Sequence, residues 1–183
     1  TVERTDHLTG VGGSTGHQFA DLDESLLAER IAGREAVMLR MGHVALAEAL
    51  ECLPDGVEVP LLLGLPEHHA MRPIDPAGFL RRLRRQSGAP IDLARSVAVP
   101  RGRAAGLMAL CQAGERIASG AVEFVLVGGI DSFIEPYLLD TLEAGQRIRN
   151  SVNADGFSPA EGAGAAGAGG RAVVGGVAVH AAR

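Results

Sequence analysis

The sequence has few aromatic side chains and few cysteines. Its 183 residues include no Trp, one Tyr and five Phe. A core must therefore be assembled from Leu, Val, Ile and Ala, with close backbone contacts at some of the 25 Gly. Hydrophobic residues make up 46% of the chain, enough at this length for one domain with its own core. The two cysteines, Cys52 and Cys111, lie in apolar stretches of helical pattern, which favours buried free thiols over a disulfide framework.

Three further absences narrow the classes of function. No apolar run reaches the length of a membrane span and no signal peptide opens the chain, so we expect a cytoplasmic protein without a membrane partner. The formal net charge of −5 argues against nucleic acid as a partner, because phosphates bind basic surfaces. The adjacent His68 and His69 lack a supporting Cys, Asp or His cluster, which predicts a polar loop and no metal site.

Two glycine-rich stretches match nucleotide-binding loops only in their spacing. Residues 162–167 fit G-x-G-x-x-G, but they lie in a run of Ala and Gly and follow a loop-like stretch rather than a strand. Residues 10–16 lack an apolar strand before them, and Asp21 and Asp23 follow too soon for a ribose contact. We therefore expect no dinucleotide and no other cofactor.

Helix and strand patterns alternate along the chain. Helices are expected at 26–31, 34–53, 75–85, 103–118 and 136–144, and strands at 57–65, 96–100, 124–129 and 173–179. Residues 1–23 have an irregular pattern, and the Ala/Gly-rich segment 163–170 is a poor strand former. Asp75 is expected to cap a helix ahead of Pro76. The alternation predicts an α/β fold with a largely parallel sheet, in a single domain over 1–183.

The stretch from Arg101 to Leu110 joins an expected strand to an expected helix through a turn of small residues. Unpaired backbone N–H groups at a helix N-terminus stabilise anions, and α/β enzymes often place a nucleophile there. This turn contains no Cys and no nucleophilic Ser, and it contains Arg103. The helix that follows, 103–118, is apolar almost all round, which predicts that it is buried at the centre of the domain.

Two motifs, in this order along the chain, resemble one family of enzymes. The first spans residues 103–131 and ends in Val127-Gly-Gly-Ile-Asp131; the second is Asp155-Gly-Phe-Ser-Pro-Ala-Glu-Gly-Ala-Gly164. Together they resemble the N-terminal half of β-ketoacyl-acyl-carrier-protein synthases, condensing enzymes of fatty acid and polyketide biosynthesis. The resemblance implies a thiolase-like layered α/β fold. The residues that it assigns to a structural motif are Gly128, Gly129, Asp131, Asp155, Gly156, Phe157, Glu161, Gly162 and Gly164.

The resemblance also indicates where the nucleophile of an active member would be. In those enzymes a Cys starts the central helix, four residues before the Leu that matches Leu107, and the matching position here is Arg103. A protonated guanidinium cannot take an acyl group from a thioester. The family's two catalytic His come from its C-terminal half. None of the His of this chain lies in a matching motif: His7, His17, His43, His68, His69 and His180.

Three functions are compatible with this replacement, and whether the chain is an enzyme stays open. The leading hypothesis is a β-ketoacyl-synthase-like protein without condensing activity, acting as a partner of a true synthase or of a carrier protein. The alternative is an acyltransferase-type enzyme that binds an acyl thioester or another anionic substrate at Arg103 without an acyl-enzyme. The third is a structural subunit whose pocket is filled. If Arg103 is structural, Asp155 or Glu161 is a candidate to neutralise it.

Two surfaces suggest partners. The densest basic cluster lies on the expected helix 75–85 and suits either an acidic acyl carrier protein or an ordinary solvated helix face. It consists of Arg81, Arg82, Arg84 and Arg85. In the thiolase fold, the strand that matches 96–100 typically pairs with its twin across a two-fold axis. The resemblance therefore implies a homodimer or a heterodimer with another synthase-like subunit.

Overall fold

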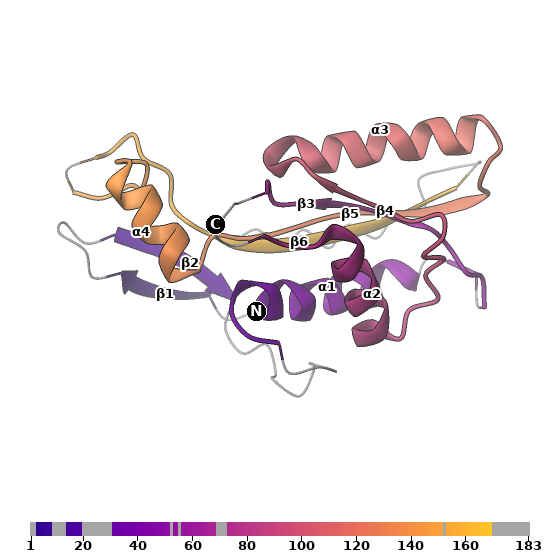
Figure 1. The fold of residues 1–183 in the computed structure, drawn as a ribbon, viewed down its shortest axis with the longest axis horizontal. Helices are drawn as coiled ribbons and strands as arrows, with labels where there is room; N and C mark the ends of the chain where they lie inside the picture. The colour runs from indigo at the N-terminus through magenta and orange to yellow at the C-terminus, as the bar shows by residue number, and fades with distance from the viewer. Residues whose placement is uncertain are drawn as a thin grey trace.

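A computed structural model describes residues 3–8, 14–19, 31–51, 53–54, 56–68, 73–151 and 153–169. Within them the chain forms strands and helices that alternate along much of its length (Figure 1). The strands are β1 (Glu3–Leu8), β2 (Ser14–Phe19), β3 (Leu61–Leu65), β4 (Val97–Pro100), β5 (Phe124–Ser132) and β6 (Glu161–Gly169). The helices are α1 (Arg34–Leu50), α2 (Pro76–Ser87), α3 (Ala105–Ala118) and α4 (Pro136–Ala144), with a 3₁₀ turn, η2 (Gly102–Ala104), directly before α3.

Four of the strands form one sheet in the order β4-β3-β5-β6, and β1 and β2 pair as a separate antiparallel hairpin. In the sheet, β3 runs parallel to β4 and to β5, while β6 runs antiparallel to β5. The predicted α/β fold with a largely parallel sheet is therefore confirmed.

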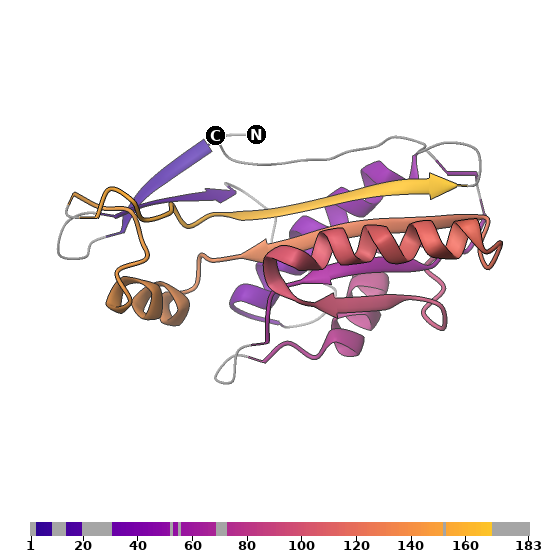
Figure 2. The same cartoon turned by 90° about the horizontal axis from the view of Figure 1, so that it is seen from above.

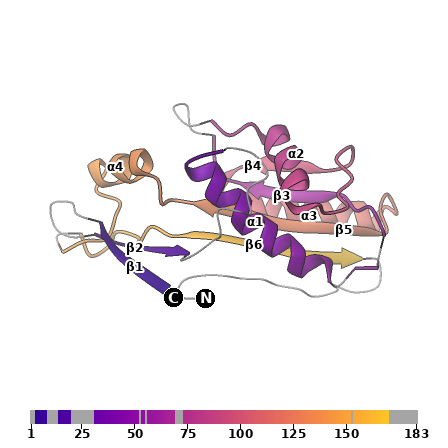
Figure 3. The ribbon, with the colours of Figure 1, turned by 90° about the horizontal axis from the view of Figure 1, so that it is seen from below.

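Helices cover both faces of the sheet. Figures 1 and 2 show α3 along one face, and Figure 3 shows α1 and α2 across the other. The side chains of β3 follow this division, because successive residues of a strand point to opposite faces. Leu61 and Leu63 pack into a core with α1 and α2, whereas Leu62 packs with Ala109 and Ala113 of α3.

Two helices begin at capping side chains. Asp75 Oδ2 accepts a hydrogen bond of 3.0 Å from the backbone N–H of Gly78, and Pro76 occupies the first turn of α2, as predicted. Glu135 caps α4 in the same way, because its Oε2 accepts a hydrogen bond of 3.0 Å from the N–H of Leu138. These caps fix where the two helices leave the preceding loops.

Other predicted elements are present with shifted ends. α1 ends three residues before the expected position, and β5 continues three residues beyond it, to Ser132. β3 begins at Leu61 rather than at residue 57, because Pro60 has no N–H group to give to a ladder. The helix expected at 26–31, apart from Ile31, and the strand expected at 173–179 lie outside the described residues.

The prediction that the central helix is buried all round is wrong. The buried side chains of α3 are three alanines one turn apart: Ala105, Ala109 and Ala113. On the other side of the helix, Leu107 is 69% exposed, Leu110 54% and Met108 41%. An apolar pattern shows that a helix favours burial, but in the described chain the four-stranded sheet covers only one side of α3 (Figure 1).

We call Leu107, Met108, Leu110 and Cys111 the open face of α3. Cys111 is exposed there, so the prediction of a buried thiol is wrong at this position. The other cysteine, Cys52, lies outside the described residues. Among the described helices, none combines the length and the apolar character that a membrane crossing requires.

Two segments expected to lack strands form them. Residues 3–8 and 14–19, within the segment 1–23 expected to be irregular, pair from Glu3↔Phe19 to Leu8↔Ser14. Such a hairpin is held by backbone hydrogen bonds, which need no apolar alternation.

β6 likewise forms within the Ala/Gly-rich segment, and it pairs with β5 along its whole length. Its alternate residues Ala163 and Ala165 pack into the core that contains α1, so tertiary packing overrides the weak strand propensity of Gly and Ala. The G-x-G-x-x-G match at 162–167 therefore lies in an extended strand and not in a phosphate-binding turn.

Candidate functional site

Three parallel strands end at the same edge of the sheet. β3 ends at Leu65, β4 at Pro100 and β5 at Ser132. Because β4 and β5 lie on opposite sides of β3, the chain changes direction across the sheet at this edge. Ligands of open α/β sheets bind at such points, outside the carboxyl ends of the strands. The candidate site is formed by the loops that leave these ends.

The start of α3 approaches β3 backbone to backbone. A Cβ atom on Gly64 would lie 2.8 Å from the backbone nitrogen of Gly106, closer than real Cβ atoms come to other atoms. Gly102 turns the chain from β4 into η2 with a φ of +53°, a conformation that strains any residue with a side chain. As a result Arg103 extends from η2, directly before the α-helix, at the mouth of the site.

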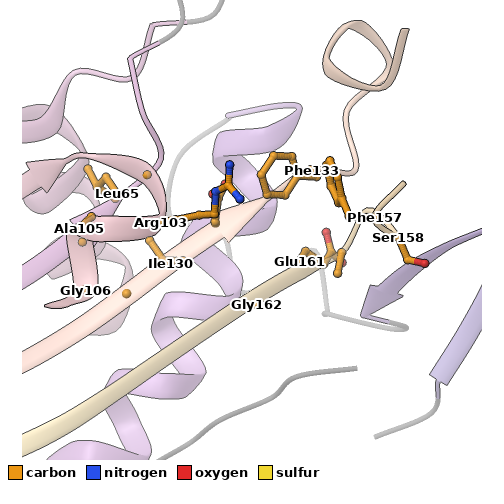
Figure 4. Close-up of a pocket in the computed structure, with 15 residues that line it drawn as sticks. Leu65, Arg103, Ala105, Gly106, Ile130, Phe133, Phe157, Ser158, Glu161 and Gly162 are labelled. Carbon is orange, nitrogen blue, oxygen red and sulfur yellow. The ribbon is translucent and has the colours of Figure 1, made fainter. Parts of the chain in front are cut away.

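An apolar hollow of about 400 Å³ lies beside the start of α3, the end of β5 and the start of β6. Its larger apolar side chains are Leu65, Ile130, Phe133 and Phe157, and much of the remaining lining is glycine and alanine (Figure 4). Arg103, Asp131 and Glu161 are its charged residues. The rings of Phe133 and Phe157 meet edge to face, with centroids 5.5 Å apart. In Figure 4 the side chain of Arg103 extends toward Phe133. The composition suits an apolar group with a polar neighbour.

A second hollow, of about 490 Å³, adjoins the first, since Arg103 lines both. We call it the cationic hollow because three arginines line it against two carboxylates. The arginines are Arg34, Arg103 and Arg147, and the carboxylates are Glu67 and Asp131. This excess of positive charge stands out in a protein whose formal net charge is −5.

Arg34 is engaged by the protein itself. One of its guanidinium nitrogens lies 2.6 Å from Asp131 Oδ1, and its Nε donates to the carbonyl oxygen of Ser132 at 2.6 Å. The Arg34 side chain is only 10% exposed. The pair joins the first residue of α1 to the end of β5 and neutralises Asp131.

Arg103 has no such partner. It is exposed, and within the part of the chain that the structure describes its side chain forms neither a hydrogen bond nor an ion pair. Asp155 is itself exposed, and Glu161 is buried and accepts a hydrogen bond of 3.1 Å from Ser132 Oγ. The interpretation in which Asp155 or Glu161 neutralises Arg103 is therefore wrong.

The second sequence motif brings Phe157 to the site through backbone contacts. The N–H of Phe157 donates to the carbonyl of Arg147 at 3.0 Å, and the N–H of Arg149 donates to the carbonyl of Phe157 at 2.9 Å. A Cβ atom on Gly156 would lie 2.4 Å from the nitrogen of Arg149, so the two segments leave room for glycine alone. The motif thus holds Phe157 beside Arg147 through backbone hydrogen bonds.

The other motif glycines lie where side chains would not fit or would fill the site. Gly129 and Gly162 line the apolar hollow. A Cβ atom on Gly128 would lie 2.8 Å from the carbonyl oxygen of Gly164 on the neighbouring strand. Because these residues of β5 and β6 are small, no side chain from the two strands fills the space of the hollow at these positions.

The basic cluster of α2 lies apart from this site, on the helix that covers the opposite face of the sheet (Figure 1). Three of its arginines form ion pairs: Arg81 with Asp75, Arg82 with Glu35 and Arg84 with Glu58. Arg85 lines a surface hollow with Arg81 and Arg84, and that hollow shares no residue with the two at Arg103.

His68 is exposed and lines the cationic hollow, whereas His69 lies outside the described residues. Within the described ranges, the His, Cys, Asp and Glu side chains form no group of three that could hold a metal ion.

Three side chains of the site were not identified from the sequence: Arg34, Phe133 and Arg147. Phe133 directly follows β5, and the loop after a parallel strand is a place to look for site residues. Arg147 lies in the segment that pairs with the second motif, which no local sequence pattern marks. Arg34 is 97 residues from Asp131 in sequence, and no local pattern marks that contact.

One carboxyl group outside the site has a shifted pKa. A hydrogen bond from the side chain of Arg95, with further hydrogen bonds from the N–H groups of Arg95 and Ala94, lowers the pKa of Asp92 below its ordinary value. This turn immediately precedes β4. There Ser96 Oγ accepts a hydrogen bond of 2.8 Å from the N–H of Leu61, which helps to align β4 with β3.

The fold and the site define an α/β protein with a candidate ligand site at the carboxyl ends of parallel strands. Residues 94–166 match the family model described as β-ketoacyl synthase, N-terminal domain. This range contains Arg103 and both sequence motifs. The predicted resemblance is confirmed, and the chain is ketosynthase-like over this range.

Among solved structures, a variant of the ketosynthase from module 6 of the bacillaene synthase from Bacillus subtilis 168 is similar, with 20% sequence identity and a TM-score of 0.48. The match covers 73% of this chain and 25% of that chain, so this chain spans about a quarter of the length of that ketosynthase. A search of curated proteins found no match.

Proposed function

We propose that this chain is a ketosynthase-like protein that does not form an acyl-enzyme and lacks condensing activity. The observation that carries the proposal is the residue at the mouth of the site. Arg103 extends from η2, where the family resemblance places the nucleophilic Cys. A guanidinium stays protonated and cannot displace a thiolate from a thioester. Cys111 is no substitute, because it lines neither hollow and lies on the open face of α3.

A second candidate function is noncovalent binding of an acyl thioester or another anionic substrate at Arg103. A separate observation favours it: the exposed Arg103 has no carboxylate partner in the described chain and borders both hollows. Such an arginine offers a planar fork of donors to a carboxylate or a phosphate. The two hollows, of about 400 and 490 Å³, also make a structural subunit with a filled pocket the least supported function.

We further propose that the chain works with a second synthase-like subunit, in a homodimer or a heterodimer. Two surfaces support this proposal. β4 is at the edge of the described sheet, with only β3 beside it, and an edge strand offers unpaired backbone groups to another chain. The open face of α3 exposes several apolar side chains together, which marks an interaction surface. An acyl carrier protein on the α2 arginines is a further proposed partner, although their ion pairs reduce the charge available to it.

Intact-mass spectrometry tests the absence of an acyl-enzyme. The chain is incubated with octanoyl-coenzyme A and, separately, with an octanoylated acyl carrier protein. We expect no octanoyl adduct, because Arg103 is not a nucleophile and Cys111 lies outside the site. A stoichiometric adduct on either cysteine of the chain contradicts the proposal.

Two variants calibrate this measurement. Cys111→Ser removes the exposed thiol and gives the baseline for adventitious acylation. Adding Arg103→Cys to that variant places a thiol where the N-terminus of α3 stabilises a thiolate, so we expect an octanoyl adduct to appear there.

A further inference from the structure

Two arginines face the cationic hollow without an internal partner. Arg103 comes from η2 and Arg147 from the segment after α4, and both are exposed. Within the residues that the structure describes, neither side chain forms a hydrogen bond or an ion pair. Arg34, the third arginine of the lining, is engaged with Asp131 and with the carbonyl of Ser132. The hollow therefore offers two cationic groups to a ligand.

Apolar side chains form much of the remaining lining. α4 contributes Leu138 and Leu142, and Phe133 and Phe157 are shared with the apolar hollow. An elongated ligand bound at Arg103 can therefore keep contact with apolar side chains along its length. A site with charged groups at one place and apolar walls around it selects a ligand with a charged head and an apolar chain.

Glu67 limits the charge that such a ligand can carry. It lines the same hollow, is exposed and has no partner in the described chain. A Cβ atom on Gly102, next to Arg103, would lie 3.4 Å from the Cβ of Glu67, so the carboxylate belongs to the same corner of the site. A nearby like charge disfavours each added negative charge. Two arginines opposed by one carboxylate leave one net positive charge at this corner, which a head with a single negative charge neutralises.

We propose that the cationic hollow binds a monocarboxylate with an aliphatic chain. The carboxylate accepts hydrogen bonds from Arg103 and Arg147, and the chain lies against Phe133, Phe157 and Leu142. The volume of about 490 Å³ falls in the range of roughly 300–1,000 Å³ that small-molecule sites occupy. The inference rests on the proposed function in one respect, namely that Arg103 is a binding group and not the position of an acylated nucleophile.

Isothermal titration calorimetry of the whole chain with three ten-carbon probes tests the head group. The probes are sodium decanoate, decyl phosphate and decanol, at pH 8. We expect decanoate to bind at least about tenfold more tightly than decanol, because charge-assisted hydrogen bonds each contribute about a factor of ten or more. Decyl phosphate carries a second negative charge at this pH and is expected to bind more weakly than decanoate.

Single substitutions test the residues. Arg103→Gln and Arg147→Gln should each weaken decanoate binding by about tenfold or more and leave decanol binding unchanged. Arg101→Gln is the matched control, because Arg101 is exposed, lines neither hollow and loses the same charge. Glu67→Gln should strengthen the binding of decyl phosphate more than that of decanoate.

Three results overturn the inference: no binding of decanoate, equal affinities for decanoate and decanol, or equal effects of Arg101→Gln and Arg103→Gln. Circular dichroism verifies the fold of each variant. Arg103→Lys keeps the charge but loses the planar fork of donors. If Arg103→Gln does not fold, Arg103→Lys replaces it, and the inference then requires that Arg103→Lys bind decanoate more weakly than the original chain does. The acyl-enzyme test is independent of these titrations. An octanoyl adduct would contradict the proposed function whether or not the affinity of the chain depends on the head group of the probe.

Discussion

At the scale of single residues, arginines of one site have different energetic roles. Arg34 is 10% exposed and bonds to Asp131 and to the carbonyl of Ser132, so its charge belongs to the packing between α1 and β5. Arg103 is exposed and, in the described chain, contacts no acceptor. Because the two side chains are chemically identical, measurements of stability can separate a structural arginine from a binding one.

Alanine substitutions at these two positions should differ in their effect on the free energy of unfolding. Arg34→Ala is expected to cost about 1–3 kcal/mol, because a carbonyl and a half-buried carboxylate lose their donor. Arg103→Ala is expected to change it by less than about 0.5 kcal/mol, as exposed side chains without partners do. Urea unfolding followed by far-UV circular dichroism measures both. A similar loss in the two variants would show that Arg103 has a structural partner.

The sequence predicted the position of Arg103 but not its neighbours. A motif fixes the order of residues along the chain, so the turn before α3 was identifiable. The neutralising role expected of Glu161 failed because Glu161 is buried, where it accepts a hydrogen bond from Ser132, whereas the side chain of Arg103 is exposed. Arg34 reaches the site only through the packing of α1 on the sheet, a contact that sequence spacing does not encode.

At the scale of elements, the spacing between β3 and α3 is set by glycine. Gly64 meets the backbone of Ala105 and Gly106, and a Cβ atom there would lie within 2.9 Å of both. A Cβ atom on Gly106 itself would meet nothing within 4 Å, because it points away from the strand. The contact between helix and strand therefore excludes a side chain at Gly64 but leaves room for one at Gly106.

These two glycines give a matched pair of substitutions. Gly64→Ala should destabilise the protein by about 1–3 kcal/mol, because the start of α3 must move away from β3. Gly106→Ala should stabilise it by about 0.5–1 kcal/mol, since alanine loses less backbone entropy in a helix. Thermal and urea unfolding of both variants provide the comparison. A neutral Gly64→Ala would contradict the close contact between the two elements.

Helices were predicted more accurately than strands for a physical reason. Capping residues such as Asp75 are local signals, and both the cap and the proline at the start of α2 are present as expected. β6 owes its place to backbone pairing with β5 and to α1, neither of which is visible in a run of Gly and Ala. The apolar pattern of α3 showed which side chains favour burial, but not whether another element of the described chain packs against them.

At the scale of the whole molecule, the open face of α3 is an exposed apolar surface. Leu107, Met108 and Leu110 are exposed together on the side of α3 that faces away from the sheet. The family model matches residues 94–166, a range that includes all of α3, β4 and β5 but not β3. Such an apolar surface drives association with whatever apolar surface is available.

Replacing two of these leucines should reduce self-association of the chain. Leu107→Gln combined with Leu110→Gln removes the most exposed apolar side chains, and their exposure means that folding is retained. Sedimentation velocity over a range of concentrations should show larger species for the original chain than for the double variant. Glu115→Gln, an exposed change one turn further along α3, is the control and should behave as the original chain does. Identical sedimentation of all three would rule out the open face as an association surface.

The small residues of β6 also bear on the order in which the molecule assembles. Glycine and alanine bring little apolar surface, so the β5–β6 ladder gains little stability until α1 is packed on it. Closing that ladder also requires a loop between Ser132 and Glu161 that contains α4, which is slow compared with local contacts. We expect β6 to join the sheet after α1 and β5 have come together. Since Glu161 and Gly162 line the apolar hollow, we expect the candidate site to be completed in the last stage of folding.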